Sequence, residues 1–294
     1  MTHPTGKPKV ICAGRVYGDL IFSGIQGVPS PGTETYCDRL SFHPGGGAFI
    51  TAAHLAAHGH ATALLATLPA APFAEITRDK IASFGVDLSD CGDAPPGTDP
   101  QITVAMVQGE DRAFLTRRDG PALPNDFAAN VRTSGAKHLH IGELATLVEC
   151  PELAQAAKAA DMTVSLDCGW DPAVFDRRHA ALIASVDVFL PNQAEQDALL
   201  DAGIAAPFSK LDVTKRGKNG ASARWSGTMI TAPAVQTDVH DPTGAGDAFN
   251  AGFLTAWLED APIEDCLKSG NTAGARAVSY AGGAGCLRTQ TAAQ

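Results

Sequence analysis

The chain has 294 residues, 45% hydrophobic and 18% charged, so it can bury a large core in one large domain with a small appendage. Its net charge of -10 argues against a surface that binds nucleic acid or an anionic membrane, because such surfaces need clustered Lys and Arg. It has no apolar run of the roughly 20 residues that span a membrane, no secretory signal and no C-x-x-C pair among its seven cysteines, which predicts a cytoplasmic protein with free thiols.

The chain begins with a predicted buried strand at 9–14, Val-Ile-Cys-Ala between a lysine and a glycine. This strand delivers residues 15–19 to its C-terminal end, where open α/β sheets bind ligands. Asp19 is therefore either a turn residue or a ligand residue.

A small separate sheet is predicted from two distant parts of the chain. Residues 20–42 form short alternating pieces broken by prolines, and 102–107 and 113–116 flank the turn Gly109-Glu-Asp111 as a hairpin. Arg117 and Arg118 end this hairpin and are expected to be solvated, although either could reach a polar substrate.

A glycine turn, Pro44-Gly-Gly-Gly47, opens a predicted helix at 48–58 that Gly59 closes. A strand at 62–66 and a helix at 76–84 follow.

From residue 138 strands and helices alternate, which predicts a mainly parallel sheet covered by helices on both faces. The expected elements are strand 138–141, helix 152–160, strand 164–167, helix 173–185, strand 186–190 and strand 210–214. Glu143 follows one strand directly and Asp167 ends the next, so both should project towards one rim, each as a structural residue or as a ligand.

Two turns come next on the same side of the predicted sheet. Asn192 and Glu195 have the spacing of a helix capping box. The turn after the strand at 210–214, Lys215-Arg-Gly217-Lys-Asn-Gly220, carries charges that could meet phosphates or could be solvated.

The run from Asp241 to Leu254 joins a glycine turn to an apolar helix that ends before Pro262. Gly244 and Gly246 allow successive N–H groups to converge on an anion at the positive end of this helix. Asp247 then either caps the helix or accepts a proton from a hydroxyl that attacks a phosphoryl group. A last helix is predicted from Pro262 to about Ala281.

The segment Asp241-Pro-Thr-Gly-Ala-Gly-Asp-Ala-Phe249 resembles the C-terminal motif of the ribokinase-like (PfkB) family of carbohydrate kinases. The resemblance implies that Asp247 is the catalytic base and that the N–H groups of Gly244, Ala245 and Gly246 form the anion hole. Asn192 and Glu195 match the family's N-x-x-E motif, in which the glutamate helps to hold Mg²⁺ near the phosphates.

Further site residues follow from the same resemblance. The substrate-binding residues that it implies are Asp19, Gly45, Gly46 and Glu143, and the nucleotide-binding residues are Thr214, Gly217, Gly220, Thr243 and Asn271. The chain departs from the family pattern at Ile50, where the family usually has a sugar-contacting Asn, and at 68–72, where a Gly-Asp-Asp-type turn is expected. The interval from Glu195 to Thr214 is also short for the family, which suggests that a helix has been trimmed.

The resemblance implies a three-layer α/β/α sandwich with a central mainly parallel sheet, formed as a single domain by residues 1–294. Residues of about 15–43 and 101–118 would form a small β lid, which in the family often pairs with a second subunit's lid, so a homodimer is expected. The implied reaction is transfer of the γ-phosphoryl group of ATP to a hydroxyl of a sugar or sugar derivative, with Mg²⁺ and a monovalent cation such as K⁺ as cofactors.

Three other functions stay open. Nucleoside kinases share the fold and the motif, and Ile50 favours an unusual acceptor over ribose. A sugar- or nucleotide-binding protein without catalysis is a second possibility, against which the intact Asp247 speaks. A Rossmann dehydrogenase is weaker, because the stretch after the first strand does not read G-x-G-x-x-G.

Overall fold

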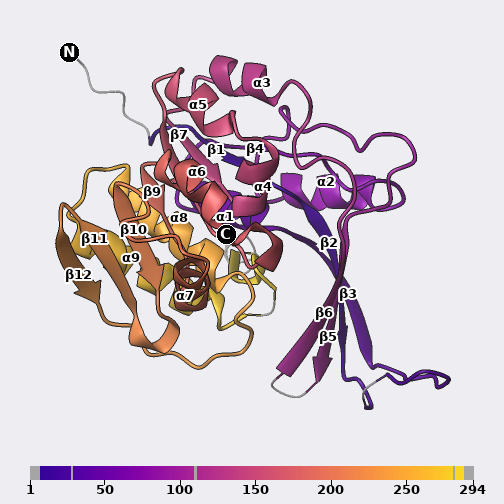
Figure 1. Cartoon of the computed structure of the whole chain (residues 1–294). Coiled ribbons are helices and arrows are strands. Elements are labelled where there is room, and N and C mark those ends of the chain that lie inside the picture. Colours follow the sequence, from indigo (N-terminus) through magenta and orange to yellow (C-terminus); the bar gives the residue numbers. More distant parts are fainter. Residues whose placement is uncertain (1–6, 28, 109–110, 281, 288–294) are drawn as a thin grey trace.

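A central eight-stranded sheet forms the middle layer of the molecule in the computed structural model, which describes residues 7–27, 29–108, 111–280 and 282–287 (Figure 1). Its strands, in spatial order, are β12 (Thr228–Ala232), β11 (Ala221–Trp225), β10 (Leu211–Lys215), β9 (Val188–Phe189), β8 (Thr163–Leu166), β7 (His138–Ile141), β1 (Val10–Ala13) and β4 (Thr62–Leu65). Neighbours from β4 to β10 pair in parallel, whereas β11 and β12 add an antiparallel edge. The predicted mainly parallel sheet is confirmed.

Helices cover both faces of this sheet because its strands are apolar on both sides. In β1, Ile11 and Ala13 pack on one face, while Val10 and Cys12 pack on the other. The first face carries α3 (Phe127–Thr133), α4 (Leu144–Glu149), α5 (Leu153–Lys158), α6 (Ala180–Ala184) and α7 (Gln193–Asp201). The second face carries α1 (Gly47–Ala57), α2 (Ala74–Ala82), α8 (Ala245–Trp257) and α9 (Ile263–Ala277). The predicted three-layer sandwich is confirmed.

A four-stranded sheet projects from the larger body and contains the strands of both predicted lid segments (Figure 1). Its order is β3 (Arg39–Gly45), β2 (Tyr17–Ser23), β5 (Ile102–Gln108) and β6 (Asp111–Arg117). The predicted turn at Gly109 and Glu110 lies outside the described residues. At the base of this sheet Phe42 stacks on Phe73 with ring centroids 5.6 Å apart, so the chain after the Pro-rich segment at 68–72 supports the lid.

The predicted helix at 173–185 is wrong as a continuous element. The chain forms two 3-10 turns, Pro172–Val174 and Arg177–His179, before the short α6. The carboxylates of Asp171 and Asp176 accept hydrogen bonds from the N–H groups two residues further on. Such local bonds compete with helix formation, and here they break the helix into turns.

Other differences are smaller. The sequence patterns missed α3, α4, β11 and β12, and α9 ends at Ala277 rather than near 281. Among the described residues, no helix is both long and apolar enough to cross a lipid bilayer.

Candidate active site

A cavity of about 630 Å³ opens at the carboxyl edge of the central sheet. One wall consists of residues that directly follow or end β7, β8 and β10, and the opposite wall is the start of α8 together with α9. Its lining includes Gly47, Glu143, Asp167, Asn192, Glu195, Lys215, Gly217, Gly220, Ala245, Gly246, Asp247 and Asn271. Most of the residues predicted for the site therefore share one hollow.

The glycine turn before α8 has a conformation that requires glycine. Gly244 has φ of 73°, and a Cβ added to it would lie 2.4 Å from the Cα of Gly283. The first helical hydrogen bond is the one from Ala248 N–H to Gly244 O, at 2.9 Å. The N–H groups of Ala245, Gly246 and Asp247 come before this bond, so they belong to the helix start, which is the positive end of the helix dipole. Ala245 N–H makes only a long contact, 3.3 Å, to Pro242 O.

Asp247 lies in the first turn of α8 and lines the cavity. Burial, followed by the negative charges of Asp167 and Glu195, raises the pKa of its carboxyl to about 7, while the Lys215 ammonium acts in the opposite direction. A carboxyl with this pKa is well suited to take a proton near neutral pH.

Lys215 and Asp167 form a buried ion pair in the floor of the cavity. The Lys215 ammonium donates to both carboxylate oxygens of Asp167 at 2.9 Å and to Asn250 Oδ1 at 3.2 Å, and Asn250 Nδ2 donates to Asp167 at 2.6 Å. Burial works to lower the pKa of Lys215, but the carboxylates of Asp167 and Glu195 outweigh it and the pKa is raised. The cavity thus holds a fixed positive charge among three carboxylates.

Asn192 and Glu195 form the capping box that their spacing predicts. Glu195 N–H donates to Asn192 Oδ1 at 2.9 Å, and Asn192 N–H donates to Glu195 Oε2 at 2.8 Å. Burial and the charge of Asp167 raise the pKa of Glu195 to about 7. Both residues line the cavity, so the cap also fixes the position of the glutamate at the start of α7.

These carboxylates fit a Mg²⁺ ion that is bound only in part by protein. No group of three His, Cys, Asp or Glu side chains within the described ranges could hold a metal by itself. Mg²⁺ usually takes one or two carboxylates and fills its other positions with water and phosphate oxygens. Burial and the negative charge of Asp167 raise the pKa values of Glu195 and Asp247, and a divalent cation bound here would favour the charged form of both carboxylates.

The predicted substrate residues Asp19 and Gly45 lie against each other beside the cavity. A Cβ added to Gly45 would lie 2.1 Å from Asp19 Oδ2, so the carboxylate occupies the space that the glycine leaves. Burial raises the pKa of Asp19 to about 7, opposed by the Thr103 hydroxyl. Gly46 (φ 99°) and Gly47 continue the turn, and a Cβ on Gly47 would be 2.9 Å from Asp247 Oδ1. The turn therefore connects Asp19 with Asp247.

For the phosphoryl transfer that the sequence predicts, replacing Gly45 by Ala should raise the KM for the acceptor at least about tenfold, because the new methyl group must push the Asp19 carboxylate aside. The KM for ATP should stay within about twofold of the unsubstituted value, since Gly45 does not line the cavity described above. Steady-state kinetics with each substrate varied in turn separate the two constants. Equal changes in both constants would show that the turn does not act on the acceptor.

Glu143 follows β7 and also lines the cavity, where Thr146 donates to its carboxylate at 2.9 Å and burial raises its pKa. Arg118, which was expected to be solvated, is 40% exposed, and it also donates to the Tyr17 hydroxyl at 3.2 Å and to Asp171 at 2.7 Å. It thereby joins the end of β6 to the rim of the larger sheet.

The predicted nucleotide residues divide into two groups. Gly217, Gly220 and Asn271 line the cavity, and the Asn271 amide donates to Pro233 O at 2.9 Å, which holds the chain after β12. Thr214 and Thr243 do not line it. Thr214 points to the opposite face of the sheet because side chains alternate along β10, and Lys215 takes the cavity position instead.

The sequence patterns missed the role of Lys215. Leu211 and Val213 pack against α8 and α9, so the same alternation places Lys215 on their face, beneath the start of α8.

Ile50, where the family usually has Asn, is 5% exposed and packs against Gly283. It offers no hydrogen bond to a ligand.

Comparison with known proteins finds relatives that are named as kinases. A family model described as pfkB family carbohydrate kinase matches residues 7–290. The ATP-dependent ribose-1-phosphate kinase of Halopiger xanaduensis is 27% identical over 273 residues, which are 91% of this chain and 90% of that protein. The nucleoside kinase of Methanothermobacter thermautotrophicus is 25% identical over 252 residues, 81% of this chain and 79% of its own.

Among solved structures, Arabidopsis thaliana ribokinase complexed with ribose and ATP has the same fold, with a TM-score of 0.80 at 21% identity. The match covers 96% of this chain and 96% of the ribokinase. The family model spans nearly the whole chain, and relatives over most of its length are named as kinases. The chain therefore belongs to the pfkB family of carbohydrate kinases.

Proposed function

We propose that this enzyme transfers the γ-phosphoryl group of ATP to a hydroxyl of a sugar or sugar derivative, with Asp247 as the general base. The observation that carries the proposal is the position of Asp247, which lines one cavity together with Gly246, Lys215 and Glu195. A carboxyl with a pKa raised to about 7 thus stands next to main-chain donors and a fixed ammonium.

In this mechanism Asp19 and the Gly45-Gly46 turn hold the acceptor so that one hydroxyl faces Asp247. Asp247 takes the hydroxyl proton while the acceptor oxygen bonds to the γ-phosphorus and the bond from that phosphorus to the leaving ADP oxygen breaks. The N–H groups of Gly244 to Gly246 receive the charge on the transferring group. Mg²⁺, positioned by Glu195 with Asn192 as its cap, would supply further positive charge at the phosphates.

The nucleotide would occupy the rest of the cavity. Its apolar part is lined by Val235, Val239 and Val278, which suit a base, while Gly217 and Gly220 allow the chain to approach the phosphates closely. Asn271 would border the base and hold the wall of this part in place.

A nucleoside acceptor is the second candidate. It is favoured by the apolar Ile50 and by the relative named as a nucleoside kinase. A coupled ADP-release assay with ATP and Mg²⁺, run over ketoses, aldoses, sugar acids, sugar phosphates and nucleosides, decides between the two classes. We expect one sugar or sugar derivative to saturate the enzyme; saturation by nucleosides alone would favour the second candidate, and no ADP release with any acceptor would contradict both.

The kcat/KM for the acceptor should depend on pH near neutrality. Asp247 must be deprotonated to act as a base, and its pKa is raised to about 7, so kcat/KM should fall about tenfold per unit as the pH drops below 7. Because Glu195 and Asp19 have similarly raised pKa values, the fall can be steeper than that of one group. A constant kcat/KM down to pH 5, as for an ordinary Asp, would exclude this assignment.

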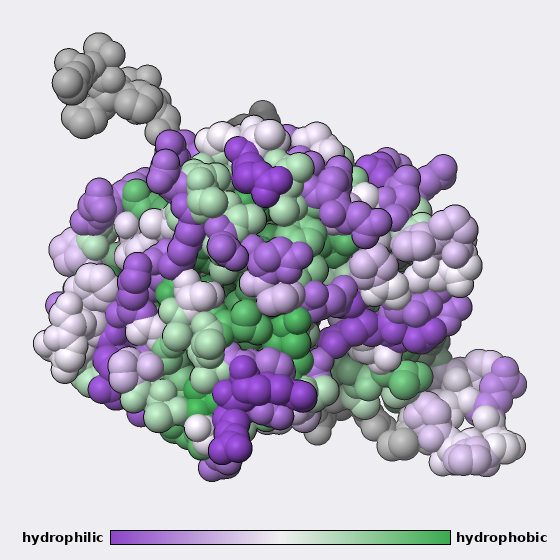
Figure 2. Space-filling view, turned by 45° about the horizontal axis from the view of Figure 1, so that its top comes forward, coloured by the Kyte–Doolittle hydropathy of each residue, from purple (hydrophilic) through white to green (hydrophobic). Residues whose placement is uncertain are grey.

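We also propose that two chains pair through their lids. The space-filling view shows a mainly hydrophilic surface with apolar side chains exposed near its middle and beside the lid (Figure 2). Within the lid sheet Leu40 and Leu115 are 58% and 68% exposed, which is costly for a lone sheet. Sedimentation should give the mass of a dimer, and Leu115→Glu should give a monomer; a monomeric unsubstituted protein would contradict the pairing.

A further inference from the structure

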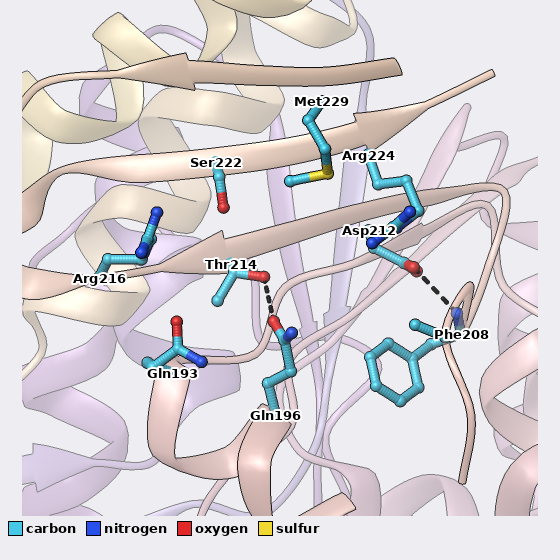
Figure 3. A pocket seen from close by; sticks show the side chains of 10 residues that line it. Gln193, Gln196, Phe208, Asp212, Thr214, Arg216, Ser222, Arg224 and Met229 are labelled. Atoms are coloured by element: carbon cyan, nitrogen blue, oxygen red, sulfur yellow. Dashed lines mark hydrogen bonds between the residues drawn. The ribbon is translucent and has the colours of Figure 1, made fainter. Parts of the chain in front are cut away.

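A second, smaller cavity of about 210 Å³ lies on the opposite face of the central sheet from the start of α8, between the strands β10 to β12 and the helix α7 (Figure 3). It is lined by Gln193, Gln196, Ala206, Phe208, Asp212, Thr214, Arg216, Ser222, Arg224 and Met229. None of the proposed steps of phosphoryl transfer uses this cavity.

The cavity exists because no helix covers this corner of the sheet. The chain runs from the end of α7 at Asp201 to the start of β10 at Leu211 without a further helix. The side chains that face outwards here are polar: Asp212 is opposite Arg224 across the strand pair, and Thr214 is opposite Ser222. A face of this kind can simply meet water, so the charges inside the hollow decide whether it is a site.

The two arginines of the cavity are not neutralised by the one carboxylate that lies beside them. The oxygens of Asp212 accept hydrogen bonds from Phe208 N–H at 2.9 Å and from Ser209 N–H at 2.8 Å. Within the described ranges, neither Arg216 nor Arg224 makes an ion pair with any carboxylate. Both guanidinium groups belong to exposed residues, and with Asp212 they leave the hollow with one more positive than negative charge in a chain whose net charge is -10.

The uncharged polar groups of the cavity are the side chains of Gln193, Gln196, Thr214 and Ser222, of which Gln193 donates to Asp197 at 2.8 Å. The Thr214 hydroxyl donates to Gln196 Oε1, which leaves the amide nitrogen of Gln196 for another partner (Figure 3). Ser222 is 5% exposed, and its hydroxyl makes no hydrogen bond to another described residue. Phe208 and Met229 provide an apolar wall. Cations and neutral donors around a small hollow match an anion better than any other ligand.

We infer that this cavity binds a small metabolite that carries two anionic groups, phosphate or carboxylate, one for each guanidinium. Arg224 is opposite Asp212, and Arg216 is four residues further along β10, roughly 13 Å at the rise of a strand. Both side chains lie along the same hollow in Figure 3, towards its two ends. An elongated dianion meets both, whereas a single phosphate meets one.

Two features connect the smaller cavity with the larger cavity. Arg216 lines both hollows, and α7, which forms one wall here, begins at the cap that positions Glu195. Occupancy of the smaller cavity should therefore change the apparent affinity for ATP, and ATP should change the affinity of the anion by the same factor.

Binding is tested by isothermal titration with hexane-1,6-diol bisphosphate and, in a separate arm, adipate, which carry two phosphates or two carboxylates at the ends of a six-carbon chain. The larger cavity is first saturated with Mg²⁺ and a non-hydrolysable ATP analogue. We expect saturable binding of at least one probe, and Arg224→Gln, which does not touch the larger cavity, should weaken it about tenfold or more. Binding of only one probe identifies the anionic group as phosphate or as carboxylate.

The matched control is Arg178→Gln, which removes the same charge from a side chain that is 71% exposed and does not line this hollow. It should leave binding within about twofold of the unsubstituted enzyme. Neither probe binding to the unsubstituted enzyme, or an equal loss in the Arg224 and Arg178 variants, would overturn the assignment. Thermal melting of both variants shows that each is folded.

Discussion

Replacing Asp247 by Asn is expected to lower kcat at least about a hundredfold, the loss typical of a missing general base, while the protein stays folded. Asn has the shape of Asp but cannot take the proton of the acceptor hydroxyl. The side chain lines the cavity at the first turn of α8, so its neutral form fits without a clash. The measurement is kcat at saturating ATP and acceptor, with thermal melting as the test of folding.

The matched control for this variant is Asp265→Asn in the first turn of α9. Asp265 holds the equivalent early position in its helix, but its side chain is 57% exposed and is absent from the cavity. Its substitution should change kcat by less than about twofold. A folded Asp247→Asn enzyme with nearly normal turnover would remove the proposed base.

Replacing Lys215 by Met is expected to lower the free energy of unfolding by about 3–5 kcal/mol, the cost of breaking a buried ion pair from one side. The ammonium, 12% exposed, donates to both oxygens of Asp167, which is itself 9% exposed. Without it the Asp167 carboxylate keeps Asn250 and the Cys168 N–H as donors but loses its only buried cation among the described residues. Chemical denaturation measures the change.

Two further variants give this stability prediction its control. Lys218→Met removes an exposed lysine from the neighbouring turn and should change the free energy of unfolding by less than about 0.5 kcal/mol. Asp167→Asn combined with Lys215→Met removes both charges and should recover much of the loss, because no buried charge then lacks a partner. A loss below about 1 kcal/mol for Lys215→Met would mean that the pair is solvated.

Much of the fold could be predicted because the relevant signals are local. Apolar strands that alternate with helices specify a covered parallel sheet, and the glycine turn before Asp247 specifies a helix start, which lies at the cavity. The prediction of a continuous helix at 173–185 was wrong because the carboxylates of Asp171 and Asp176 accept hydrogen bonds from nearby N–H groups. The spacing of apolar residues carries no information about such local hydrogen bonds.

Motifs in the sequence pick out many residues that line the candidate cavity, whereas contacts that depend on three-dimensional packing were missed. Thr214 was assigned to the nucleotide from the family resemblance, whereas strand alternation gives the position at the cavity to Lys215. The partners of Lys215 are Asp167 and Asn250, which are 48 and 35 residues away in the sequence. No short pattern contains such a pair, although a lysine at the end of a buried strand is a usable signal.

The most direct measurement is a crystal structure of the enzyme with Mg²⁺, a non-hydrolysable ATP analogue and the acceptor identified by ADP release. We expect the acceptor hydroxyl within hydrogen-bond distance of the Asp247 carboxylate and the γ-phosphate at the N–H groups of Gly244 to Gly246. An acceptor whose hydroxyl faces another side chain, or a γ-phosphate bound away from that turn, would contradict the proposed mechanism.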